Sequence, residues 1–173
     1  MKLVNAALAG ALLMLAACVQ PPAPQETLQT LRYEGAMVTF APDAREAVSR
    51  EVNEAEFGRQ IADAVTASLA DRQGSRPATI EINVVFYTLP KGAAAIVPFA
   101  TKVPTLITEV TLKDADTGAV IGGKTSLAAN YASPGGIFVG SGAVSEADEQ
   151  ARQVIGEYVA ALRTLLTETQ PQS

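Results

Sequence analysis

The sequence predicts an α+β fold, a two-layer sandwich in which a four-stranded, mostly antiparallel sheet carries two helices on one face. Two stretches repeat apolar residues at helical spacing, and two others alternate apolar with polar residues as half-buried strands do. The predicted elements follow one another as strand, helix, strand, strand, strand and helix. Each helix has one apolar stripe, so both helices are expected on the same apolar face of the sheet.

The first strand and the first helix come early in the domain. Residues 37–40 form a short β-like run that ends before Pro42, because proline cannot donate a hydrogen bond to a neighbouring strand. A helix is predicted over residues 54–72, and Asn53 and Glu56 at its start have the spacing of a capping box, in which each side chain satisfies a free backbone N–H. The apolar stripe of this helix recurs every four residues and consists of Phe57, Ile61, Val65 and Leu69.

Three further strands are predicted as a meander. Residues 79–88 and 106–113 alternate with a period of two, and residues 119–131 return as the partner of the second run. The turn between the last two, residues 114–118, contains two aspartates and a glycine, all favourable in tight turns. Gly122–Gly123 predicts a bulge in the last strand. The inward positions of the first strand of the meander are predicted to be Ile80, Ile82, Val84 and Phe86.

The last helix is predicted to begin at Ser145 and to continue to about residue 168. A strand–helix–strand connection favours a parallel pair, whereas the meander strands pair antiparallel. Residues 31–168 are therefore predicted to form one domain, with a frayed tail at 169–173. The stripe of the last helix is Ala151, Val154, Ile155, Tyr158, Leu162 and Leu165.

The N-terminus has the pattern of a secretory signal: Lys2 precedes an apolar core and small residues, and the chain's one cysteine, Cys18, follows directly. The core is about twelve residues long, short of the roughly twenty that span a bilayer. This stretch resembles the lipobox of bacterial lipoproteins. The resemblance implies that residues 1–17 are removed, that Cys18 carries a covalent lipid and that the peptidase recognises Leu15, Ala16 and Ala17. The alternative is an ordinary signal peptide followed by an incidental cysteine.

The resemblance also bears on where the protein is held. Two or more acyl chains anchor a protein stably, whereas one binds reversibly. Residue 19 is valine rather than the aspartate that commonly retains Gram-negative lipoproteins at the inner membrane, which favours the periplasmic face of the outer membrane. Residues 18–30 are rich in proline and glutamine and are predicted to form a tether of up to about 35 Å.

Composition narrows the function classes. Without Lys2 the mature chain has 12 basic and 18 acidic residues, a net charge of −6, which repels nucleic-acid phosphates, so no nucleic-acid partner is expected. The chain contains no histidine, and acylated Cys18 leaves no thiol, so no metal site and no cofactor besides the covalent lipid are predicted. Asp114 and Asp116 are assigned to a hairpin turn, because a calcium loop would need a side-chain oxygen ligand where Gly118 stands and a glutamate where Thr125 stands.

Two connections are unusual for their apolar content. Residues 91–104 and 134–144 link predicted elements, and connections of this length are commonly functional. The second is glycine-rich but lacks the lysine of a phosphate-binding P-loop. One interpretation is an exposed surface for a partner or a lipid; the other is that both loops cover the open sheet face and complete the core. The candidate contact residues are Ile96, Val97, Phe99, Ile137, Phe138 and Val139.

The function predicted first is that of a non-enzymatic, lipid-anchored envelope lipoprotein with a binding or assembly domain that faces the periplasm. The partners expected for it are the membrane, through the lipid anchor, and an envelope protein. A small-ligand or lipid-binding domain, with its cleft between the two apolar loops, is the alternative, and an enzyme comes third. No catalytic residue is assigned, since no lysine is singled out for a Ser–Lys arrangement. The element order and the Asp-x-x-Thr-Gly hairpin resemble uncharacterised small α+β envelope lipoprotein domains; residues 37–168 also resemble the lipopolysaccharide-assembly lipoprotein in element order.

Overall fold

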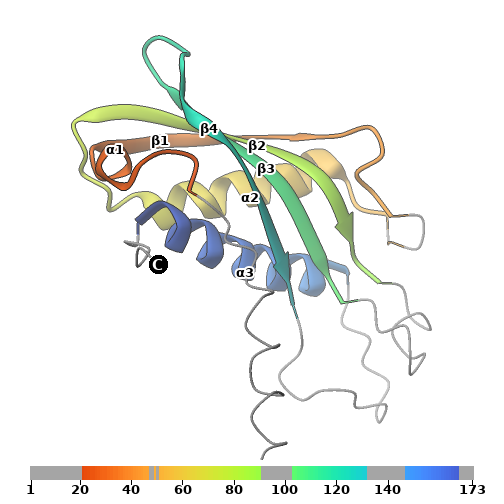
Figure 1. The fold of residues 1–173 in the computed structure, drawn as a ribbon. Helices are drawn as coiled ribbons and strands as arrows, with labels where there is room; N and C mark the ends of the chain where they lie inside the picture. Colours follow the sequence, from red (N-terminus) through yellow and green to blue (C-terminus); the bar gives the residue numbers. More distant parts are fainter. Residues whose placement is uncertain (1–20, 47–48, 50, 91–102, 132–146, 168–173) are drawn as a thin grey trace, which may run out of the picture.

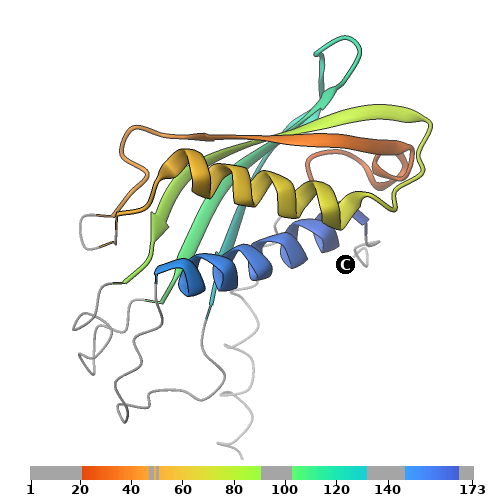
Figure 2. The ribbon, with the colours of Figure 1, turned by 180° about the vertical axis from the view of Figure 1, so that it is seen from behind.

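The computed structural model describes residues 21–46, 49, 51–90, 103–131 and 147–167. The strands form one sheet in the order β1-β2-β3-β4, and the two long helices lie side by side across one face of it (Figures 1 and 2). This is the predicted α+β two-layer sandwich. The elements are α1 (Gln25–Gln29), β1 (Leu31–Phe40), α2 (Glu54–Leu69), β2 (Arg76–Thr88), β3 (Thr105–Asp114), β4 (Val120–Asn130) and α3 (Ala147–Thr167).

The strand pairing follows the predicted connections. β1 pairs parallel with β2 across the α2 connection, and β2, β3 and β4 pair antiparallel as a meander. The hairpin between β3 and β4 is the predicted aspartate turn: the Asp114 carboxylate accepts hydrogen bonds from the Thr117 N–H (3.0 Å) and hydroxyl (2.9 Å), and Gly118 has φ +71°. Residues that are paired on neighbouring strands form rows across the sheet. One such row consists of Thr39, Asn83, Glu109 and Ser126, one residue from each strand.

The core lies between the sheet and the two long helices. Both predicted helical stripes are buried, and β3 buries its alternate residues as predicted. Tyr158 of α3 meets Thr108 of β3 inside this layer, with their hydroxyl oxygens 3.1 Å apart. Burial raises the pKa of the Tyr158 hydroxyl far above its ordinary value, so it stays protonated and able to hydrogen-bond.

The predicted inward face of β2 is wrong at its C-terminal end. A register shift between Val84 and Phe86 inserts one extra residue, which turns the following side chains to opposite faces. Tyr87 is consequently fully buried and Phe86 is only half-buried. Tyr87 stacks edge-on against Phe40 with ring centroids 5.9 Å apart, and its hydroxyl donates to the Glu54 carboxylate (3.1 Å).

The tether predicted over residues 18–30 is wrong for residues 22–30, which we call the lead-in segment. The segment packs on the domain and contains α1, whose Leu28 side chain is 0% exposed. The Gln25 side chain donates to the Thr167 carbonyl at the end of α3 (3.4 Å). The proline content suggested an extended linker, but burial of Leu28 and Ala23 in the core stabilises a folded segment instead.

We predict that Leu28→Ala lowers the free energy of unfolding by about 2–5 kcal/mol, because it empties a fully buried site. Gln29→Ala is the matched control, since Gln29 is exposed on the same short helix, and it should change stability by less than about 0.5 kcal/mol. Urea unfolding of both variants measures the difference. Equal, small effects would show that the lead-in segment contributes nothing to the domain.

Candidate functional site

All of the contact and lipidation residues predicted from the sequence lie outside the described residues. These predictions therefore stay predictions, and they concern Leu15, Ala16, Ala17, Cys18, Ile96, Val97, Phe99, Ile137, Phe138 and Val139. The structure does place the elements that flank the two apolar connections. Thr88, Thr105 and Asn130 are register partners at one end of the sheet, so both connections start from the same edge of the domain (Figure 1).

The lead-in segment docks on the bulge in β4. The carbonyl of Pro22 accepts a hydrogen bond from the backbone N–H of Gly123 (2.6 Å), and Gly122 has φ +78°. A Cβ added to Gly122 would collide with the Pro22 carbonyl oxygen and would lie 2.9 Å from the Ala23 Cβ. The Gly122–Gly123 bulge predicted from the sequence is thus confirmed by the register shift opposite Thr111 and Leu112. Its role as a docking point for the chain's own N-terminal segment could not be inferred from the glycines alone.

The sheet face turned away from the helices carries a row of hydrogen-bonded polar side chains. The Thr39 hydroxyl donates to the Asn83 amide oxygen (3.3 Å), and the Asn83 amide donates to Glu109 (3.5 Å). Lys124 completes the row with an ammonium nitrogen 3.0 Å from the same Glu109 oxygen. A shallow cavity of about 260 Å³ lies over this open face, lined by Met37, Thr39, Glu81, Asn83, Glu109, Thr111 and Lys124.

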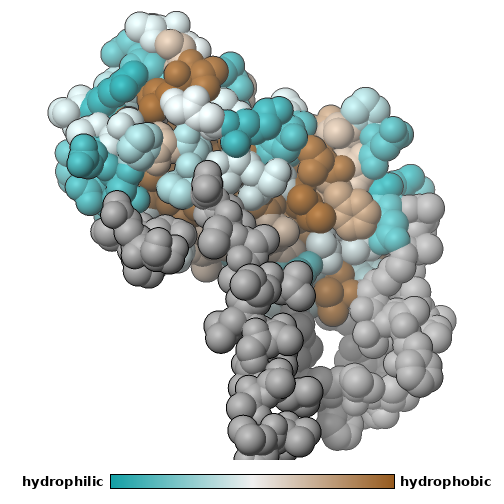
Figure 3. Space-filling model, viewed as in Figure 1, coloured by the Kyte–Doolittle hydropathy of each residue, from teal (hydrophilic) through white to brown (hydrophobic). Residues whose placement is uncertain are grey.

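The charges of the open face are paired across strands. The hydrogen bond from Lys124, and after it that from Asn83, holds the pKa of the Glu109 carboxyl below its ordinary value. Glu81 of β2 forms an ion pair with Lys113 of β3, at 2.6 Å. The two exposed large apolar side chains of the described residues, Met37 and Val120, lie on opposite edge strands. On the side of the molecule seen in Figure 3, brown apolar patches are separated by hydrophilic areas.

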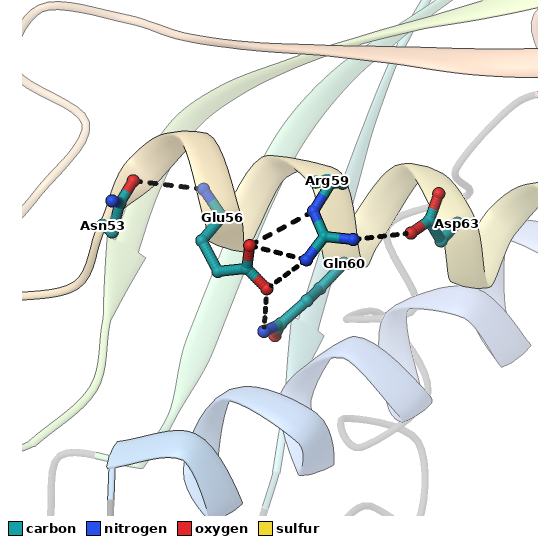
Figure 4. Close-up of polar contacts among 5 residues, drawn as sticks. All are labelled: Asn53, Glu56, Arg59, Gln60 and Asp63. Atoms are coloured by element: carbon teal, nitrogen blue, oxygen red, sulfur yellow. Dashed lines mark hydrogen bonds and ion pairs between the residues drawn. The ribbon is translucent and has the colours of Figure 1, made fainter.

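A groove of about 620 Å³ runs between α2 and α3. Its apolar lining comes from both helices, through Ala64 of α2 and Ile155 and Val159 of α3. Its charged lining is Asp63 of α2 and Asp148 and Arg152 of α3. On the surface of α2, Arg59 lies between Glu56 (2.7 Å) and this Asp63 (3.7 Å), as Figure 4 shows. This groove is distinct from the predicted cleft between the two apolar loops, which lies outside the described residues.

The start of α2 shows half of the predicted capping box. The Asn53 side chain accepts a hydrogen bond from the Glu56 N–H (3.2 Å), as expected (Figure 4). The Glu56 carboxylate, however, turns along the helix to Arg59 and Gln60. These contacts, with that of Arg59 the strongest, lower the pKa of Glu56. The charged side chains on this surface of α2 are therefore paired with one another by hydrogen bonds and ion pairs.

Polar side chains of the described residues form hydrogen bonds and ion pairs with one another. The described residues include no group of three or more metal-ligating side chains. Asp114, the aspartate of the predicted turn, is held by Arg76 at 2.9 Å; that contact and the Thr117 hydrogen bonds lower its pKa. No helix in the described ranges is both long enough and apolar enough to cross a membrane.

Comparisons with known proteins give fold-level likenesses only. No family model and no curated protein matches the chain. A presumed lipoprotein from Caulobacter crescentus matches with 17% identity and a TM-score of 0.36, covering 83% of this chain and 92% of its own. A PelC dodecamer from Paraburkholderia phytofirmans has 10% identity and a TM-score of 0.40, covering 88% and 96%. A DUF330 protein from Xanthomonas campestris has 13% identity and a TM-score of 0.37, covering 80% of each chain. Likenesses at this level support no statement about function.

We predict that Gly122→Ala detaches the lead-in segment, because the new methyl group and the Pro22 carbonyl cannot occupy the same space. Gly118→Ala is the matched control: it also has positive φ but open space around the added Cβ, so it should cost only the roughly 1–2 kcal/mol of left-handed backbone. Hydrogen exchange of the Gly123 amide and of residues 22–30 reports detachment. Unchanged protection in Gly122→Ala would show that the docking is not sterically defined.

We predict that Lys124→Met raises the pKa of Glu109 toward its ordinary value, as it removes the strongest of the contacts that lower it. A lowered pKa in the folded state contributes stability above the unfolded pKa and loses it as the pH falls through the folded one. Lys124→Met should therefore make stability less sensitive to acid. Carbon-13 NMR titration of the Glu109 carboxyl measures the shift, with Lys113→Met as the control that should leave Glu109 unchanged.

Proposed function

We propose that this chain is a lipid-anchored lipoprotein of the cell envelope, whose single domain acts as a non-enzymatic binding or assembly module. The observation that carries the proposal is Cys18, placed directly after the lipobox-like Leu15-Ala16-Ala17 and only four residues before Pro22, where the folded domain begins. The short distance along the chain between Cys18 and Pro22 suits a domain that works at the surface of the membrane to which its lipid is attached.

The membrane proposed for the anchor is the outer membrane, on its periplasmic face. Its support is Val19, which stands where an aspartate commonly retains lipoproteins at the inner membrane. The net charge of −6 also argues against an association with membranes through charge alone, which leaves the lipid as the attachment.

Binding is preferred over catalysis for two physical reasons. The carboxylates of the described residues whose pKa is shifted have it lowered, whereas acid–base catalysis near neutral pH usually requires a raised one. The chain also lacks histidine, the commonest general base. The open face, with its cross-strand polar row, is the surface proposed for a protein partner.

The anchor is tested by Cys18→Ser, which removes the acylated thiol. We expect the wild-type protein in the membrane fraction, with an intact mass that corresponds to a chain beginning at Cys18 plus lipid, and the variant outside that fraction. Val19→Ala leaves the lipobox intact and should behave as the wild type. An unmodified wild-type chain that still begins at Met1 would overturn the proposal.

A further inference from the structure

The lead-in segment determines which side of the domain is closest to the anchor. Pro22 is bound to Gly123 on β4, which is an edge strand of the sheet. Four residue steps separate Pro22 from Cys18, and a fully extended chain of that length spans at most about 14 Å. If Cys18 carries the lipid, as proposed above, the bulge of β4 at Gly123 cannot move farther than this from the bilayer surface.

The side chains of β4 suit a position beside phospholipid headgroups. The strand contains no acidic residue and one basic residue, Lys124, in a mature chain of net charge −6. An acidic domain that is brought close to anionic lipids is repelled least along a strand that has no carboxylate of its own, and Lys124 neutralises the neighbouring Glu109 carboxylate on β3 (3.0 Å). The exposed side chains of the strand beyond the bulge are short or polar and allow close approach: Lys124, Ser126, Ala128 and Asn130.

The opposite edge of the sheet is β1, and three strand spacings, about 14 Å, separate it from β4. We infer that the domain is held with its β4 edge against the phospholipid headgroups and its β1 edge directed away from the membrane. This inference rests on the proposed lipid anchor. It adds an orientation, in which a partner in the periplasm meets the β1 side of the open face first.

The test compares the distance from the bilayer of two positions in one register row of the sheet. Thr39 and Ser126 are joined through Asn83 and Glu109 in register, are both exposed and lie on the same face, so they differ mainly in their distance from β4. Thr39→Cys and Ser126→Cys each provide the one reactive thiol of a chain whose Cys18 is acylated. Each full-length lipidated protein is labelled with a fluorophore and placed in phosphatidylcholine–phosphatidylglycerol vesicles that contain a headgroup-nitroxide lipid as quencher.

The expected result is severalfold stronger quenching at residue 126 than at residue 39. Insertion of a flexible Gly-Ser linker between Gln20 and Pro21, which leaves the described contacts of the domain untouched, should remove most of this difference. Equal quenching at both positions in protein that carries lipid would overturn the orientation while the proposed function stands. Absence of lipid in the intact mass would overturn both.

Discussion

The structure depends on one constraint: the sheet has a single apolar face, and this face must be covered. Two helices with one apolar stripe each meet that requirement, and their connections then dictate the strand directions, parallel across α2 and antiparallel within the meander. The other sheet face is free of this demand, so it can carry the Thr39–Asn83–Glu109–Lys124 row. Because the helices cover only one face of the sheet, that face is apolar and the opposite face is polar.

The parts of the fold that could be predicted from the sequence are those set by local periodicity. The stripes around Ile61 and Tyr158 and the alternation of β3 each repeat over several turns or residues, so one pattern specifies a whole element. The burial of Tyr87 was not predicted, because the extra residue of a bulge reverses the alternation of inward and outward side chains. A prediction from strict alternation assumes that the strand contains no such extra residue. Leu28 escaped it because one apolar residue among prolines and glutamines has no period at all.

The candidate surfaces were less accessible to sequence reasoning for a different reason. A lipobox is contiguous, so Cys18 can be recognised from its neighbours, whereas the polar row joins residues from four strands and exists only through register. The outward positions of Asn83 and Glu109 were predictable one strand at a time. Their alignment with Thr39 and Lys124 depends on the strand order and on the register shifts in β1, β2 and β4, which local patterns do not specify.

The docking point for Pro22 also has a consequence in time. Its partner glycines come one hundred positions later in the chain, at 122 and 123, so the docking point does not exist before β4 has been synthesised. An enzyme that acts on the N-terminus before β4 has been synthesised would therefore meet an undocked lead-in segment. Pro22 acquires its hydrogen-bond donor only when β4 has joined the sheet, so in the proposed lipoprotein the processing of the N-terminus can precede docking of the lead-in segment.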